Sequence, residues 1–154
     1  MGDTVELEYV GFWLRVWASL IDTLLILIAT IPLLWALYGR DRLADGVVLT
    51  GPANLFISYL LPAIVVIAFW RAKDATPGKM VIGARIVDAK TGGSPSLGQH
   101  IIRYLGYFVS TIPACLGLIW VGIDSRKQGW HDKLAGTVVV RRKNGGAEPV
   151  RFGG

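Results

Sequence analysis

Two residues of opposite charge in the first apolar segment, Arg15 and Asp22, have the types and spacing for proton or cation chemistry. Seven residues apart on a helix, they lie within about 20° of one face and about 10.5 Å apart along the axis. Asp22 is roughly ten residues into the segment, so we expect it about 15 Å deep, near the midplane of a bilayer. A carboxylate at that depth is costly unless it is protonated, paired or facing a wet cavity.

The sequence leaves two interpretations of this carboxylate open. Asp22 can bind a proton or a cation, with Arg15 adjusting its affinity. Alternatively, it lies in a helix–helix contact, where the small residues Ala18 and Ser19 let a partner helix approach and a protonated Asp22 donates a hydrogen bond across. The side chain of Arg15 is long enough to reach the lipid head groups.

A second polar cluster runs from Asp124 to Asp132 and contains His131, which ordinarily titrates near neutral pH. Asp132 can orient His131 or pair with Arg126 or Lys127. The alternative is an interfacial helix whose charges are solvated. With His100 as the one other histidine and a single cysteine, no ligand spacing for a metal is present, and we predict neither a metal site nor a cofactor.

The segment Thr76-Pro77-Gly78-Lys79 lacks the spaced glycines of a phosphate-binding loop. We predict a tight turn here, with Lys79 near lipid phosphates. The sequence also contains no Ser/His/Asp or Cys/His set with an orienting partner, so we do not expect an enzyme.

Apolar residues make up 53% of the 154-residue chain and are concentrated in three runs, which is typical of an α-helical integral membrane protein. The first two runs, Phe12 to Tyr38 and Ala53 to Trp70, are each long enough to cross a bilayer. In the second, Asn54 and Ser58 lie four residues apart on one face and form a secondary polar candidate.

The third run, Leu105 to Ile123, has Pro113 near its middle and is either one crossing or a re-entrant hairpin that breaks at Pro113. Two segments rich in β-branched residues, Met80 to Asp88 and Thr137 to Val140, are predicted strands. Ser96 is a predicted N-cap for the helix before the third run.

Basic residues predict the orientation. The loop between the first two runs holds two, Arg40 and Arg42, whereas the segment after the second run holds six: Arg71, Lys73, Lys79, Arg85, Lys90 and Arg103. The longer segment and the N-terminus are therefore expected in the cytoplasm. The C-terminal tail is also basic, and the two predicted strands can pair only on a shared side, which favours the re-entrant hairpin and a small β element on the cytoplasmic side.

Three sequence blocks resemble the RDD family of small bacterial membrane proteins. They are Gly11-Phe12-Trp13-x-Arg15 through Ile21-Asp22; Thr76-Pro-Gly-Lys79 with Gly83 and Val87-Asp88; and Gln128-Gly-Trp-His-Asp132 through Val140. The family is named for one arginine and two aspartates. The resemblance maps the first two onto Arg15 and Asp22 and the third onto Asp132, with Asp124 as the alternative. It implies an N-terminal segment (1–11), a membrane domain (12–142) and a tail (143–154).

The resemblance also implies a role in transport, with some members exchanging cations for protons. In that hypothesis Asp22 alternates between protonated and cation-bound states, and Asp132 or His131 lies at the cytoplasmic mouth. Three short runs enclose a pathway poorly, so a homo-oligomer is expected. The alternative is a non-enzymatic scaffold that packs helices through Arg15 and Asp22 and binds a membrane protein partner.

The net charge of +5 is expected to meet anionic lipid head groups and not nucleic acid, because the basic residues flank apolar runs. The expected location is the bacterial cytoplasmic (inner) membrane.

Overall fold

Two long helices dominate the computed structural model, which describes residues 6–39 and 52–143. Helix α1 (Phe12–Tyr38) is followed by a second long helical segment made of α3 (Pro52–Leu55), a π-helical turn η1 (Phe56–Leu60) and α4 (Leu61–Lys73). The π-turn ends just before Pro62, whose missing N–H removes one helical hydrogen bond. Residues 12–36 and 56–81 are long and apolar enough to cross a membrane, which confirms the two predicted spans.

The third apolar run is broken into two helices. Helix α6 (Leu97–Thr111) begins at the predicted N-cap, where the Ser96 hydroxyl and the Gln99 side chain form a capping box. Helix α7 (Leu116–Ile123) follows a break at which Ala114 and Cys115 adopt positive φ angles. The two helices are bent by 101° relative to each other, so this run is not one straight helix.

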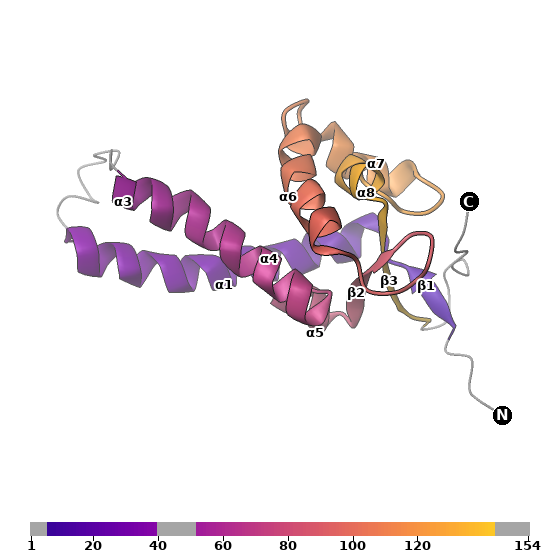
Figure 1. Ribbon diagram of the computed structural model, residues 1–154, viewed down its shortest axis with the longest axis horizontal. Helices are drawn as coiled ribbons and strands as arrows, with labels where there is room; N and C mark the ends of the chain where they lie inside the picture. The colour runs from indigo at the N-terminus through magenta and orange to yellow at the C-terminus, as the bar shows by residue number, and fades with distance from the viewer. Residues whose placement is uncertain (1–5, 40–51, 144–154) are drawn as a thin grey trace.

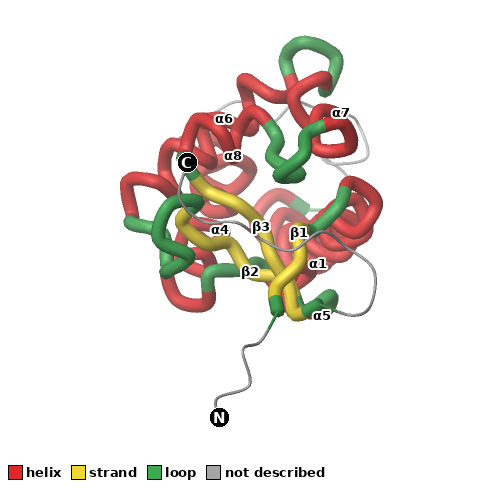
Figure 2. The backbone as a smooth tube through the Cα atoms, turned by 90° about the vertical axis from the view of Figure 1, so that its right-hand side faces the viewer, coloured by secondary structure: helices red, strands yellow, loops and turns green. Residues whose placement is uncertain are grey.

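A three-stranded antiparallel sheet joins three distant parts of the chain. Strand β3 (Thr137–Arg142) lies between β1 (Leu7–Tyr9) and β2 (Ala84–Asp88). The pairing of the two predicted strands is therefore confirmed, whereas β1 is too short to show an alternating pattern and was not predicted. The sheet places the described N-terminal and C-terminal segments at the same end of the long helices (Figures 1 and 2).

The predicted strand over Met80–Asp88 is wrong in its first half. Residues Pro77–Val81 form a short helix, α5, because proline suits the first turn of a helix. Gly83, with a φ of 67°, then turns the chain into β2.

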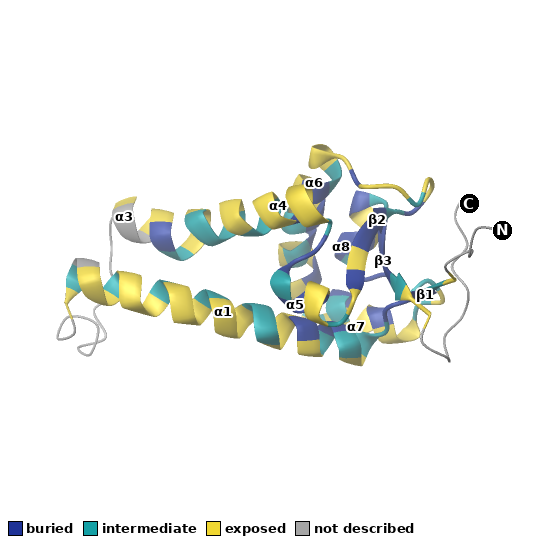
Figure 3. Cartoon of the chain, turned by 90° about the horizontal axis from the view of Figure 1, so that it is seen from below, coloured by how far each residue is buried: buried dark blue, intermediate teal, exposed yellow. Residues whose placement is uncertain are grey.

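The buried core lies at the sheet end of the molecule. One face of the sheet packs against Trp70 at the end of α4, together with Val10, Ile86 and Val139. Helix α8 (Trp130–Ala135) packs mainly on α6. Beyond this core few residues of the two spans are buried: 6% and 11% of the residues in their apolar stretches are buried within the chain (Figure 3).

Candidate functional site

A buried ion cluster joins α1, α6 and α8 at the sheet end. Arg15 of α1 donates to the Asp132 carboxylate of α8 at 2.5 Å, and Arg103 of α6 forms an ion pair with the other carboxylate oxygen. The Asp132 side chain is fully buried. Arg15 also donates to the backbone carbonyls of Val10 and Lys127, and Arg103 donates to the Thr137 hydroxyl at 2.9 Å. The cluster thereby connects the first span with the helices and strand that complete the fold.

The two guanidinium groups determine the charge state of Asp132. Burial alone would raise the pKa of this carboxyl, but Arg103 and Arg15 outweigh burial and hold its pKa well below the usual range. Asp132 is therefore ionised at every physiological pH. A buried charge of this kind is stable only while it remains paired.

His131 lies against the same cluster as a neutral ring. Its ring stacks on Tyr107 at a centroid distance of 4.0 Å, and its Nδ1 is 3.3 Å from the Ser110 hydroxyl. Burial lowers the pKa of His131 to about 3, against the attraction of Asp132, whose carboxylate is 3.5 Å from Nε2. The expected titration of His131 near neutral pH is therefore wrong for the folded protein.

This depressed pKa makes the folded protein sensitive to acid. The unfolded histidine takes up a proton near pH 6.5, whereas the folded one does so near pH 3, so stability is present above pH 6.5 and is lost as the pH falls. Because of His131, we expect the free energy of unfolding in detergent to be about 2 kcal/mol lower at pH 5 than at pH 7. The free energy of unfolding, measured as a function of pH, should fall less steeply with acid for His131→Asn than for wild type. An equally steep fall would show that His131 is not the source of the acid sensitivity.

Asp22 is held by the N-terminus of α5. The Thr76 hydroxyl donates to one carboxylate oxygen, and the Gly78 N–H donates to the other at 2.7 Å. The backbones are in close contact: a Cβ on Gly78 would lie 2.0 Å from the carbonyl oxygen of Ala18. Only glycine permits this approach of α5 to α1.

Asp22 lies beside α5, which follows the charged residues at the end of α4. The position of Asp22 near the bilayer midplane stays a prediction, whereas the expected position of Arg15 is wrong. Arg15 does not extend to the lipid head groups, because its side chain turns inward to Asp132 and is 11% exposed.

Lys79 is mostly buried but lines both cavities described below, and its position near lipid phosphates stays a prediction. It is 6% exposed, and its amine lies 3.4 Å from the Thr76 hydroxyl. The turn predicted over Thr76–Lys79 is the first part of α5. Lys79 therefore belongs to the interior, next to the Asp22 contact.

The remaining candidates lie apart from the ion cluster. Asp124 caps the following turn through the N–H groups of Arg126 and Gln128 and pairs with Lys133 at 2.5 Å. These donors outweigh burial and lower the pKa of Asp124. Ser19 is exposed on α1 and lines both cavities described below. The side chain of Asn54 lies outside the described part of the structure.

Sequence reasoning missed the roles of Arg103, Thr76 and Gly78. The sequence analysis counts Arg103 only among the basic residues that predict the orientation, although it is completely buried. Threonine before Pro-Gly is the pattern of a helix N-cap followed by proline at the first position, and helix N-termini favour carboxylates. That pattern could have indicated a partner for Asp22.

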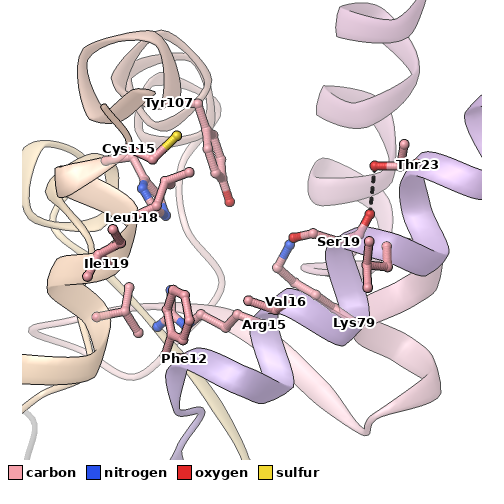
Figure 4. Close-up of a pocket in the computed structure, with 13 residues that line it drawn as sticks. Phe12, Arg15, Val16, Ser19, Thr23, Lys79, Tyr107, Cys115, Leu118 and Ile119 are labelled. Atoms are coloured by element: carbon pink, nitrogen blue, oxygen red, sulfur yellow. Dashed lines mark hydrogen bonds between the residues drawn. The ribbon is translucent and has the colours of Figure 1, made fainter. Parts of the chain in front are cut away.

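Two cavities lie on either side of Lys79 and Tyr107. The larger, of about 290 Å³, lies between α1, α6 and α7 and is also lined by Arg15 and His131 (Figure 4). The smaller, of about 250 Å³, lies between α1, α4 and α6 and includes Asp22. Within residues 6–39 and 52–143, no group of three or more His, Cys, Asp or Glu side chains could hold a metal ion.

Comparison with known proteins agrees with the resemblance in sequence. The RDD family pattern matches residues 9–136. An uncharacterized membrane protein of Bacillus subtilis, YteJ, is 32% identical over 145 residues, covering 88% of this chain and 82% of that protein. Another B. subtilis protein, YckC, is 29% identical over 140 residues, covering 84% of this chain and 83% of its own length.

A Rickettsia prowazekii protein, RP437, is 43% identical over 75 residues, which is 49% of this chain and 41% of that protein. The match to RP437 therefore spans less than half the length of that relative. No solved structure matches the chain. The match over residues 9–136 shows that this chain is a member of the RDD family of membrane proteins.

Proposed function

We propose that this chain is a non-enzymatic assembly module of the bacterial cytoplasmic membrane. In this proposal Arg15, Asp22 and Asp132 fix the sheet end, and the two spans associate with those of further copies or of another membrane protein. The main support is the contrast in burial between the ends of the molecule. Asp132 is fully buried among its partners, whereas only 6% and 11% of the residues in the apolar stretches of the two spans are buried within the chain.

The sheet end is proposed to face the cytoplasm. All three strands lie at this end, and it carries Arg71, Lys73, Arg85 and Lys90, among other basic residues. An excess of Lys and Arg in loops near the ends of spans marks the cytoplasmic side. The bend between α6 and α7 supports a re-entrant arrangement, because the chain then returns to the same side to form β3.

Cation–proton exchange is a second candidate function, and a different observation supports it. Asp22 is partly exposed and lines the 250 Å³ cavity together with Thr76 and Lys79. A carboxylate beside a cavity in a membrane protein can take up and release protons. Against this role, both of its oxygens already accept hydrogen bonds from α5.

Two substitutions at Asp22 separate the candidates. Asparagine can still accept from the Gly78 N–H and can donate to the Thr76 hydroxyl, whereas leucine loses both bonds. We expect Asp22→Asn to keep stability within about 1 kcal/mol and to retain association in lipid, and Asp22→Leu to lower both. Subunit counting by single-molecule photobleaching in bilayers measures the association. A strictly monomeric wild-type chain in lipid would contradict association between copies, which is the part of the assembly proposal that these variants test.

The same variants test exchange in proteoliposomes. A pH-sensitive dye is trapped inside, Na⁺, K⁺ or Li⁺ is added outside, and Asp124→Asn, which removes a carboxylate that lines neither cavity, serves as the control. The assembly proposal expects no cation-dependent proton movement in well-inserted wild type. Movement that is lost in Asp22→Asn and kept in Asp124→Asn would instead establish exchange with Asp22 as the coupling site.

A further inference from the structure

The larger cavity is a groove with apolar walls and a polar floor. Its walls come from α1 and α7, where Leu20 and Ile119 are about half exposed along the apolar surface of the molecule. Its floor carries the side chains of Lys79, Tyr107 and His131. Figure 4 shows the amine of Lys79 and the hydroxyl of Tyr107 directed into the space between α1 and the α6–α7 region.

The buried amine of Lys79 has incomplete pairing. Among the described residues its one hydrogen bond is the long contact of 3.4 Å to the Thr76 hydroxyl. That hydroxyl donates its own proton to Asp22, whose second oxygen accepts from Gly78. A buried ammonium group is costly without a close counter-charge.

The surrounding charges leave a positive excess. Three basic side chains lie at or near the floor of the groove, and each is at least nine-tenths buried: Arg15, Lys79 and Arg103. Two carboxylates, Asp22 and Asp132, face them, and His131 is neutral at physiological pH. One further negative charge would balance the group. Arg15 and Lys79 both line the groove, but Arg15 is paired with Asp132, whereas Lys79 has no ion pair among the described residues.

We propose that this groove binds an anionic phospholipid of the surrounding bilayer. The head-group phosphate lies at the Lys79 amine and accepts from the Tyr107 hydroxyl, and an acyl chain lies against Leu20, Leu118 and Ile119. The groove is small, at about 290 Å³, so it holds the phosphate region and the first part of one chain, with the remainder in the bilayer. This inference is independent of the proposed assembly role.

Binding of short-chain lipids to the full chain in a neutral detergent tests the proposal. Native mass spectrometry would compare dioctanoyl phosphatidylglycerol with dioctanoyl phosphatidylcholine. We expect phosphatidylglycerol to bind at least tenfold more tightly to wild type. Lys79→Met, which keeps the length of the side chain, should reduce the preference to less than twofold, and Lys90→Met, at an exposed lysine, should leave it intact.

Filling the groove provides a second variant that does not alter charge. Ile119→Trp, on the exposed wall, should weaken phosphatidylglycerol binding severalfold even if Lys79→Met does not fold. Equal binding of the two lipids by wild type would overturn the proposal, as would an equal loss in Lys90→Met. Full displacement of the lipid by millimolar inorganic phosphate would show a site for free anions and would also overturn it.

Discussion

Replacing Asp132 by asparagine is expected to lower the free energy of unfolding by about 4 kcal/mol. The substitution keeps the shape of the side chain and removes only its charge. The guanidinium groups of Arg15 and Arg103 would then remain buried without a counter-charge. Water cannot compensate for its loss at Arg103, because that side chain is fully inaccessible to solvent. Substitutions that leave a buried cation without a partner are among the most destabilising single substitutions.

The matched control is Asp124→Asn in the same polar segment. Asp124 pairs with Lys133, whose side chain is 43% exposed, so the loss of this ion pair should cost no more than about 1 kcal/mol. Unfolding of both variants can be followed by tryptophan fluorescence during titration with a denaturing detergent. Similar losses at the two aspartates would mean that the buried cluster does not stabilise the fold.

Replacing Gly78 by alanine is expected to lower stability by about 3 kcal/mol, the second largest effect. The new methyl group would lie 2.0 Å from the Ala18 carbonyl oxygen. No side-chain rotation can relieve this clash, because the oxygen belongs to the backbone. Helix α5 must then move away from α1, and Asp22 loses the hydrogen bonds from Gly78 and Thr76. Increased proteolysis between α4 and β2 would report this separation.

Gly98→Ala provides the control for a glycine near the start of a helix. A Cβ there meets only the Ser96 hydroxyl oxygen at 3.8 Å, which is ordinary contact, and alanine is the better helix former. We therefore expect unchanged or slightly increased stability for Gly98→Ala. A Gly78→Ala protein as stable as Gly98→Ala would show that the close approach of α5 and α1 is not required.

The membrane spans could be predicted from sequence because length and apolar character act locally. Two runs of about twenty apolar residues need no knowledge of the rest of the fold to be identified. The Ser96 cap is local for the same reason, since its partner Gln99 is three residues away. Strand β1 has three residues and depends on pairing with β3, more than 120 positions later, so no local pattern indicates it.

The site could be predicted as a set of residues but not as a set of pairs. The sequence analysis names Arg15, Asp22 and Asp132 as candidates. It considers Arg15 and Asp22 as a pair, because they share one helix face. In the structure each bonds to a different element: Arg15 to α8 and Asp22 to α5. These contacts join residues 54 to 117 positions apart, and helical spacing contains no information about them.

The most direct measurement is a double-mutant cycle on Arg15 and Asp132 in lipid. The free energy of unfolding would be compared for wild type, Arg15→Met, Asp132→Asn and the double variant. If the pair fixes the first span to the sheet end, the double variant should be less destabilised than the sum of the single variants by about 1–3 kcal/mol. Additive losses, within about 0.5 kcal/mol, would contradict a direct link between these residues and with it the proposed basis of assembly.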